Sequence, residues 1–291
     1  MKYLILFFTI IFLVITSSFA DTLDKLKNLE KNFDGKIGVY ALNTNNNQII
    51  SYRADERFPV QSTMKLIGVS ALLKKSNSNK KLLKEKIHYK KNDVMFWHPV
   101  TGKYIKTGMT LEALAESAIT YSDDPAMNLI LKKFGGPEFA TDFAHTMGNL
   151  SFNVTHYEGD LNSTPTNIED TSTPKDMAMS LQKLTLGNTL SPSHREQLIT
   201  WMRNNTVGYK RIRAGVPSGW IVADKTGSGD YGIANDIGIL WSPLCKPIVL
   251  AIYTIRTTQN AKKRDDVVAL ATKIVLDEFA KNSPCFMELN K

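Results

Sequence analysis

The spacing of apolar residues predicts where helices and strands lie along the chain. Residues 21–33 carry apolar positions on one helical stripe, and residues 35–58 predict a strand, an Asn-rich turn and a second strand. From residue 59 to about residue 201 the pattern is mostly helical, with Thr, Asp, Pro or Gly at the expected starts and stops. Three strands are predicted after residue 217, and a last helix is predicted over about residues 261–281.

This order of elements predicts an α/β (α+β) sandwich. The early strands most simply join the late ones in one five-stranded antiparallel sheet, flanked by helices from the two ends of the chain. We expect residues 21–57 and 205–291 to form a discontinuous α/β domain, and residues 58–204 to form an inserted all-α domain. Residues 150–174, within that insert, show little periodicity and predict a long loop, which is often a functional segment.

The first twenty residues have the pattern of a secretory signal peptide. Lys2 precedes an apolar stretch over residues 4–15, and Ser18-Phe19-Ala20 is a small-x-small cleavage site. The alternative is an uncleaved anchor, but the apolar stretch is short for a membrane span. We therefore expect residues 1–20 to be removed and the mature protein to be periplasmic or secreted, with no membrane attachment after cleavage.

Composition and charge exclude several classes of function. The chain has 36 Lys and Arg against 28 Asp and Glu, but its basic residues are spread out and form no stripe interleaved with aromatics. We therefore expect no nucleic-acid partner. The five His show no paired metal-ligand spacing, so no metal site or other cofactor is expected.

The two cysteines are candidates for a disulfide. Cys245 precedes the strand "IVLAIYTI", and Cys285 follows the last helix. A strand of ~8 residues spans ~26 Å and a helix of ~20 residues ~30 Å, so a helix running back along the strand would bring both cysteines to the same end of the sheet. A Cys245–Cys285 bridge is therefore a hypothesis that two free thiols in the exported protein would reject.

Ser62 and Lys65 stand three apart at the start of an apolar run, which places them on one helix face. They are either a nucleophile beside a proton acceptor or two polar residues on a solvated surface. The Ser-x-x-Lys pattern alone is weak, because it recurs at Ser78, Ser172 and Ser180. The context of Ser62 differs, because its helix is apolar almost all round and a buried Lys is costly unless it is paired or used.

Three further segments carry groups suited to the same chemistry. "YSDD" places Ser122 and Asp124 in a turn between helices, and "EGDLN", residues 158–162, lies in the long loop. Lys225-Thr226-Gly227 ends a predicted strand, whereas the same letters at Lys106 open a helix.

With these four segments in this order, the chain resembles the class A serine β-lactamases. The likeness covers essentially the whole mature chain, including "DTSTPKDMA", "RIRAGVP" and "DKTGSGDYGIAND". It is greatest to the branch with serine carbapenemases and extended-spectrum enzymes. The resemblance implies a monomer whose active site lies between the two domains, hydrolysis of β-lactam antibiotics through a serine acyl-enzyme, and antibiotic resistance.

The resemblance also implies roles for individual residues. Ser62 would attack the lactam carbonyl with Lys65 against it, and Ser122 would pass a proton to the leaving nitrogen. Glu158 would be the general base for deacylation, and Asn162 would hold the water. The substrate itself, a small-molecule β-lactam, would be bound by Lys225, Thr226, Gly227, Ser228, Arg211, Asp124 and Trp97.

The chain departs from the family pattern at three places. Asp124 stands where the family usually has Asn, so an acceptor-only group replaces an amide that donates to the substrate's side-chain carbonyl. Gly159 follows Glu158 where many relatives have Pro and a cis bond, and a cis bond before a residue other than Pro costs ~3 kcal/mol. Gln61 and Gly229 occupy the positions of the active-site cysteine pair of related carbapenemases, which argues against strong carbapenem turnover.

Two alternative functions share these motifs. A penicillin-binding D-Ala-D-Ala carboxypeptidase or transpeptidase would form a long-lived penicilloyl adduct. A non-catalytic β-lactam or peptidoglycan sensor would stay acylated or would not be acylated. Glu158 discriminates, because only the hydrolase needs a base that activates water.

Overall fold

The computed structural model describes residues 21–281 and 283–286. The predicted signal peptide over residues 1–20 lies outside the described residues. Within them, no helix has both the length and the apolar character that a membrane span requires.

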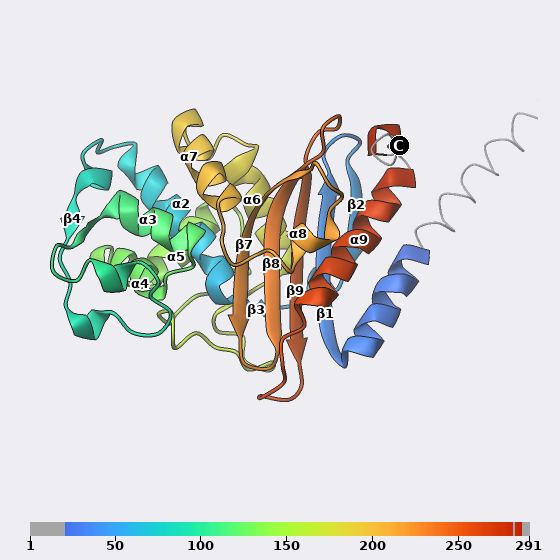
Figure 1. Cartoon of the computed structure of the whole chain (residues 1–291), viewed down its shortest axis with the longest axis horizontal. Helices are drawn as coiled ribbons and strands as arrows, with labels where there is room; N and C mark the ends of the chain where they lie inside the picture. The colour runs from blue at the N-terminus through green and yellow to red at the C-terminus, as the bar shows by residue number, and fades with distance from the viewer. Residues whose placement is uncertain (1–20, 282, 287–291) are drawn as a thin grey trace, which may run out of the picture.

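One five-stranded antiparallel sheet forms the centre of the molecule, as predicted (Figure 1). Its strand order is β2-β1-β9-β8-β7, so the two strands from the start of the chain join the three from its end. β1 and β9 pair along their whole lengths, from Gly35 opposite Arg256 to Asn43 opposite Ile248. The strands are β1 (Gly35–Asn43), β2 (Gln48–Tyr52), β7 (Ile221–Gly229), β8 (Ile233–Trp241) and β9 (Ile248–Arg256).

Alternation along the strands divides the interior into two apolar cores. In β1, Val39 and Ala41 face one core while Tyr40 and Leu42 face the other, as the period of two requires. The helix over residues 21–33 and α9 (Asp265–Lys281) cover the first face, as expected for the terminal helices (Figure 1). The helical part of the chain covers the other face, so the sheet is buried on both sides.

The helical part is built around α2 (Met64–Ser76), which is buried along most of its length. The predicted helix starts at Thr110, Thr173 and Ser191 are confirmed, because each of these side chains accepts a hydrogen bond from a first-turn N–H. The helix predicted from Asp124 begins there, and the side chain of the preceding Asp123 caps it. The other helices here are α3 (Leu111–Thr120), α4 (Asp124–Lys133), α5 (Glu138–Thr146), α6 (Pro174–Thr185) and α7 (Pro192–Arg203). The short helix α8 (Ile212–Gly215) packs instead against α9, on the opposite face of the sheet.

Short elements connect the helical part to the sheet. The 3₁₀ turn η1 (Gln61–Thr63) leads into α2 and lies against β7. Further 3₁₀ turns are η2 (Leu82–Lys84), η3 (Lys91–Asp93), η4 (Thr101–Lys103) and η5 (Pro284–Phe286). Two small antiparallel pairs join β3 (Phe58–Pro59) to β6 (Thr171–Ser172) and β4 (Lys86–Ile87) to β5 (Met109–Thr110). The predicted loop over residues 150–174 contains no helix until α6 begins.

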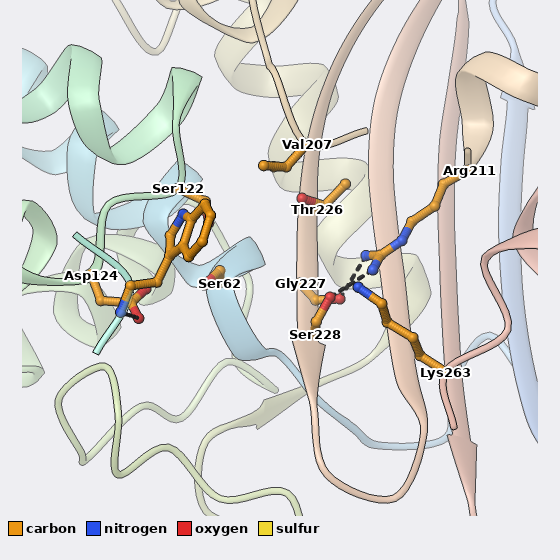
Figure 2. A pocket seen from close by; sticks show the side chains of 10 residues that line it. Ser62, Ser122, Asp124, Val207, Arg211, Thr226, Gly227, Ser228 and Lys263 are labelled. Atoms are coloured by element: carbon orange, nitrogen blue, oxygen red, sulfur yellow. Dashed lines mark hydrogen bonds between the residues drawn. The ribbon is translucent and has the colours of Figure 1, made fainter. Parts of the chain in front are cut away.

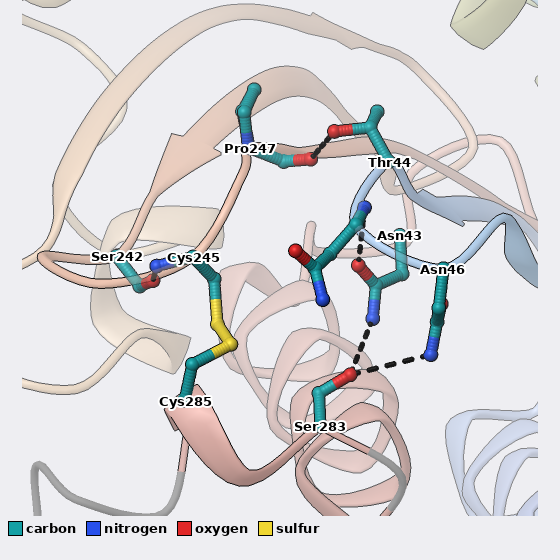
Figure 3. Close-up of a disulfide and its surroundings, with 9 residues drawn as sticks. Asn43, Thr44, Asn46, Ser242, Cys245, Pro247, Ser283 and Cys285 are labelled. Carbon is teal, nitrogen blue, oxygen red and sulfur yellow. Dashed lines mark hydrogen bonds between the residues drawn. A yellow bond between two sulfur atoms is a disulfide. The ribbon is translucent and has the colours of Figure 1, made fainter.

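The hypothesis of a Cys245–Cys285 bridge is confirmed in the structure (Figure 3). The two Cα atoms lie 5.7 Å apart, within the usual range for a disulfide. Close by, the side chains of Asn43 and Asn46 both donate to the Ser283 hydroxyl. The end of the chain after α9 is therefore tied to the loop between β8 and β9 and to the β1–β2 turn.

Candidate active site

A cleft of about 370 Å³ lies between the edge strand β7 and the helical part, and it contains most of the residues predicted from the motifs (Figure 2). Ser62 lies near its middle, Trp97 and Asp124 lie at the helical side, and β7 forms the opposite wall. The lining residues are Ser62, Trp97, Ser122, Asp124, Val207, Arg211, Thr226, Gly227, Ser228 and Lys263.

Ser62 and Lys65 are in direct contact, as the helix-face argument predicted. The Lys65 Nζ atom is 2.9 Å from the Ser62 Oγ atom, and the Lys65 side chain is fully buried. Lys65 also donates to the Ser122 carbonyl at 2.9 Å and to Asp124 Oδ1 at 2.6 Å. These three contacts use all three N–H donors of an ammonium group.

Glu158 reaches the same cluster from the long loop. Ser62 Oγ donates to Glu158 Oε2 at 3.2 Å, and Lys65 Nζ lies 3.2 Å from Glu158 Oε1. Burial raises the pKa of the Glu158 carboxyl above its ordinary value; the Lys65 charge opposes this shift, and the negative charge of Asp124 adds to it. Ser62 is therefore placed between an amine and a carboxylate.

Asn128 is a residue of this site that the sequence analysis missed. Its Oδ1 atom accepts the Glu158 N–H at 2.9 Å, and its Nδ2 atom donates to the Glu158 carbonyl at 3.0 Å. The two bonds clamp the Glu158 backbone to α4. Its spacing could have indicated it, because Asn128 follows Asp124 by one helical turn and so lies on the same face of α4.

Ser122 lies between two lysines. Lys225 Nζ donates to Ser122 Oγ at 2.9 Å, and Lys65 Nζ lies 3.4 Å from the same atom. Burial lowers the pKa of Lys225 to about 7, and repulsion by Lys65 adds to this effect. The Ser122 hydroxyl thus has two amines within reach, one of which titrates near neutral pH.

The end of the cleft across from Trp97 and Asp124 is basic. Arg211 is nearly buried, and its Nη2 atom donates to Ser228 Oγ at 2.6 Å. Thr226 and Gly227 precede Ser228 on β7. A side chain at Gly227 would lie 2.9 Å from the Val60 carbonyl oxygen, so glycine lets β7 approach the segment that carries Ser62.

Asp124 and Trp97 form the helical wall together. Asp124 Oδ2 accepts the Trp97 backbone N–H at 3.2 Å, and the Trp97 indole donates to the Tyr121 carbonyl at 2.9 Å. More than half of the Trp97 side chain is exposed. Asp124 thus links the wall to Lys65 and leaves no donor of its own toward the cleft.

The structure does not pair Asn162 with Glu158. The Asn162 Nδ2 atom donates to the Asn167 and Glu169 carbonyls, and its Oδ1 atom accepts the Thr164 N–H at 2.7 Å. These bonds orient the side chain within its own loop. The expected role of Asn162 is to hold a water molecule rather than to bond Glu158 directly, and that role stays a prediction.

The Glu158–Gly159 peptide is trans, since no described residue has a cis bond. Gly159 has φ +99°, a conformation that favours glycine. A Cβ atom there would lie 2.1 Å from Cε2 of Phe96, so the Phe96 ring covers the position that a larger residue would need. Gly159 in place of Pro thus fits both the backbone and this aromatic neighbour.

No group of three or more His, Cys, Asp or Glu side chains in the described parts of the chain is arranged to hold a metal ion. The chemistry available at the cleft is that of two serine hydroxyls, two amines and two carboxylates. Such a set suits nucleophilic attack on a carbonyl followed by base-assisted hydrolysis.

Comparisons with known proteins agree with this geometry. β-Lactamase OXY-2 of Klebsiella oxytoca is 45% identical over 254 residues, which cover 87% of this chain and 88% of that protein. β-Lactamase 3 of Bacillus cereus is 47% identical over 250 residues, covering 86% and 78%. The crystal structure of a β-lactamase from Desulfarculus baarsii superposes with a TM-score of 0.88 at 40% identity, covering 90% of this chain and 98% of that one.

The model of the family described as "Beta-lactamase enzyme family" matches residues 22–279, nearly the whole described chain. This match, the relatives above and the motif order agree with the class A resemblance. The chain therefore belongs to the β-lactamase enzyme family, as a class A serine enzyme.

Proposed function

We propose that the protein hydrolyses penicillins and cephalosporins through an ester between Ser62 and the opened lactam, and so confers resistance to them. The observation that carries this proposal is the contact of Ser62 Oγ with both Lys65 Nζ at 2.9 Å and Glu158 Oε2 at 3.2 Å. A serine hydroxyl at its ordinary pKa is a weak nucleophile and needs such a neighbouring base.

In acylation, Ser62 Oγ attacks the lactam carbonyl and loses its proton to the buried cluster. Glu158 accepts the hydroxyl hydrogen bond and is placed to take its proton, while Lys65 donates to the same oxygen and stabilises the negative charge that develops on Oγ. The backbone N–H groups of Ser62 and Ser228 would receive the carbonyl oxygen, and one such donor contributes about a hundredfold to a thousandfold in rate.

Opening the ring breaks the C–N bond, and the leaving nitrogen needs a proton. Ser122 is suited to supply it, because its hydroxyl lies 2.9 Å from Lys225 Nζ and 3.4 Å from Lys65 Nζ. The proton that Ser122 gives up is replaced from one of these amines. The pKa of Lys225, lowered by burial to about 7, makes it an effective donor near neutral pH.

In deacylation, Glu158 would take a proton from a water molecule that attacks the ester carbonyl. Its Oε1 atom is buried and accepts no hydrogen bond from the described residues, so it retains acceptor capacity for a water. The Asn128 clamp fixes the backbone of this base. Asn162, in the same loop, would help to hold that water, while its amide also bonds to carbonyls of the loop.

At the basic end, Arg211, Ser228, Lys225 and Thr226 would bind the substrate carboxylate. This carboxylate is attached next to the lactam nitrogen, while the acylamino group is attached next to the lactam carbonyl. The two substituents therefore point to opposite ends of the cleft. The acylamino group falls on the Asp124 and Trp97 side.

The export step is also part of the proposal. A signal peptide over residues 1–20 would deliver the protein to the periplasm or the medium, where the Cys245–Cys285 disulfide persists. The protein acts there as a monomer on diffusing antibiotics, since each chain carries all the groups that the reaction uses.

A chromogenic cephalosporin assay tests the proposed activity. The wild-type protein is expected to open the ring with turnover, and Ser62→Ala to lose at least about a thousandfold in kcat. Ser78→Ala, in another Ser-x-x-Lys sequence, is the matched control and should keep wild-type turnover. An inert wild-type protein, or full activity in Ser62→Ala, would refute the proposal.

A further inference from the structure

Lys263 lies in the cleft, although no motif pointed to it. It belongs to residues 257–264, between the end of β9 and the start of α9, and it lines the same cavity as Ser62. Figure 2 shows its side chain reaching toward Ser228, beside the Arg211 guanidinium. The cleft therefore has a further cation at its basic end, in addition to Arg211 and Lys225.

Arg211 has little hydrogen-bonding capacity left for a ligand. Its Nε–H donates to Asp265 at 2.7 Å, and its Nη1 atom donates to the Gly227 and Asn235 carbonyls at 2.8 and 2.7 Å. One Nη2 hydrogen goes to Ser228 Oγ at 2.6 Å. Since a guanidinium has five N–H donors, one remains.

The positive charge of Arg211 is also compensated within the protein. Asp265 forms an ion pair with it at 2.7 Å. The neighbouring Arg264 pairs with Asp266. No carboxylate in the described part of the chain lies within 4.0 Å of the Lys263 ammonium, so its charge is uncompensated. An anion that binds at Ser228 is therefore attracted by the unpaired charge of Lys263 more than by the compensated charge of Arg211.

We propose that Lys263 is a specificity-determining residue, which binds the ring carboxylate of the substrate and disfavours β-lactams with a cation beside that carboxylate. The inference rests on the proposed function. In cephalosporins the ring carboxylate and the C3 substituent are on adjacent carbons. A group at C3 therefore lies close to whatever binds the carboxylate, and a positive charge there is repelled by Lys263.

Two cephalosporins with the same thienylacetyl side chain test this directly. Cephalothin has a neutral acetoxymethyl group at C3, and cephaloridine has a cationic pyridiniummethyl group. The readout is the ratio of kcat/KM for cephalothin to that for cephaloridine. Comparing this ratio between variants cancels the different intrinsic reactivities of the two compounds.

Lys263→Gln is expected to lower the ratio by about twofold to fivefold, the range of a solvent-exposed charge pair, mainly through KM. Lys263→Glu should lower it further, Lys263→Arg should restore it, and added salt should reduce the wild-type ratio. Lys262→Gln is the matched control, because Lys262 is an exposed neighbour that does not line the cleft.

An unchanged ratio in Lys263→Gln, or the same fall in Lys262→Gln, overturns the inference. A wild-type protein that hydrolyses neither cephalosporin overturns the proposed function, and this inference with it. Hydrolysis of both compounds with a ratio insensitive to Lys263 overturns the inference alone.

Discussion

Asp124 places a second carboxylate against Lys65, and Asp124→Asn tests what that charge does. Lys65 Nζ lies 2.6 Å from Asp124 Oδ1 and 3.2 Å from Glu158 Oε1. The negative charge of Asp124 adds to the effect of burial in raising the pKa of Glu158. Replacing the carboxylate by an amide removes this repulsion, so the pKa of Glu158 should fall.

The size of the repulsion between the Asp124 and Glu158 carboxylates follows from the geometry. Both oxygens contact the same Nζ atom, so they are separated by at most about 5.8 Å. Two unit charges at that distance repel by about 0.7 kcal/mol in water and about 3 kcal/mol at an effective dielectric constant of 20. Removing a repulsion of this size should lower the pKa of Glu158.

The assay is the pH profile of kcat. A general base works only when deprotonated, so activity is lost as pH falls through the pKa of Glu158. In Asp124→Asn this acid limb should therefore move to lower pH. The amide should also raise kcat/KM for acylamino β-lactams, because it donates to their side-chain carbonyl. Asp142→Asn is the control. It removes the same charge at an exposed position on α5, outside the cleft, and should leave the pH profile unchanged. An acid limb that stays put or moves to higher pH in Asp124→Asn would refute the reasoning.

Two other changes test the loop and the basic end. Gly159→Ala adds a side chain at φ +99°, where its Cβ would lie 2.1 Å from Phe96, so it should cost about 1–3 kcal/mol of unfolding free energy in a thermal or urea melt. Adding Phe96→Ala should recover the steric part of that loss, and wild-type stability in Gly159→Ala would contradict the close approach of Phe96 to Gly159. Because the pKa of Lys225 is about 7, kcat/KM should fall as pH rises through neutrality and Lys225 loses its positive charge. Lys225→Arg should flatten that alkaline limb, and a limb unchanged by this variant would exclude Lys225 as its source.

Much of the fold followed from patterns that report on local physics. Apolar runs predicted the strands, and Thr, Ser, Asp or Pro at the helix starts predicted the helices. The Cys245–Cys285 bridge followed from matched strand and helix lengths. In each case the sequence feature that allowed the prediction lay within one helix or strand, or depended only on the lengths of two such elements.

The site was predictable where the residue types are unusual for their setting. A Lys in a buried helix, such as Lys65, needs partners, and the structure supplies them. The orientation of Asn162 was not predictable, because its amide bonds with carbonyls of its own loop, whose path no pattern describes. Lys263 was equally inaccessible, since a Lys in a polar loop has no distinguishing context until the fold brings it beside Ser228.

The most direct measurement is intact-protein mass spectrometry of Glu158→Gln after mixing with benzylpenicillin. We predict a long-lived adduct with the mass of the whole opened penicillin, located by digestion on Ser62. Glu169→Gln, an exposed acid in the same loop, should turn over and leave no adduct. Wild-type turnover in Glu158→Gln, or an adduct on any residue other than Ser62, would contradict the proposed mechanism.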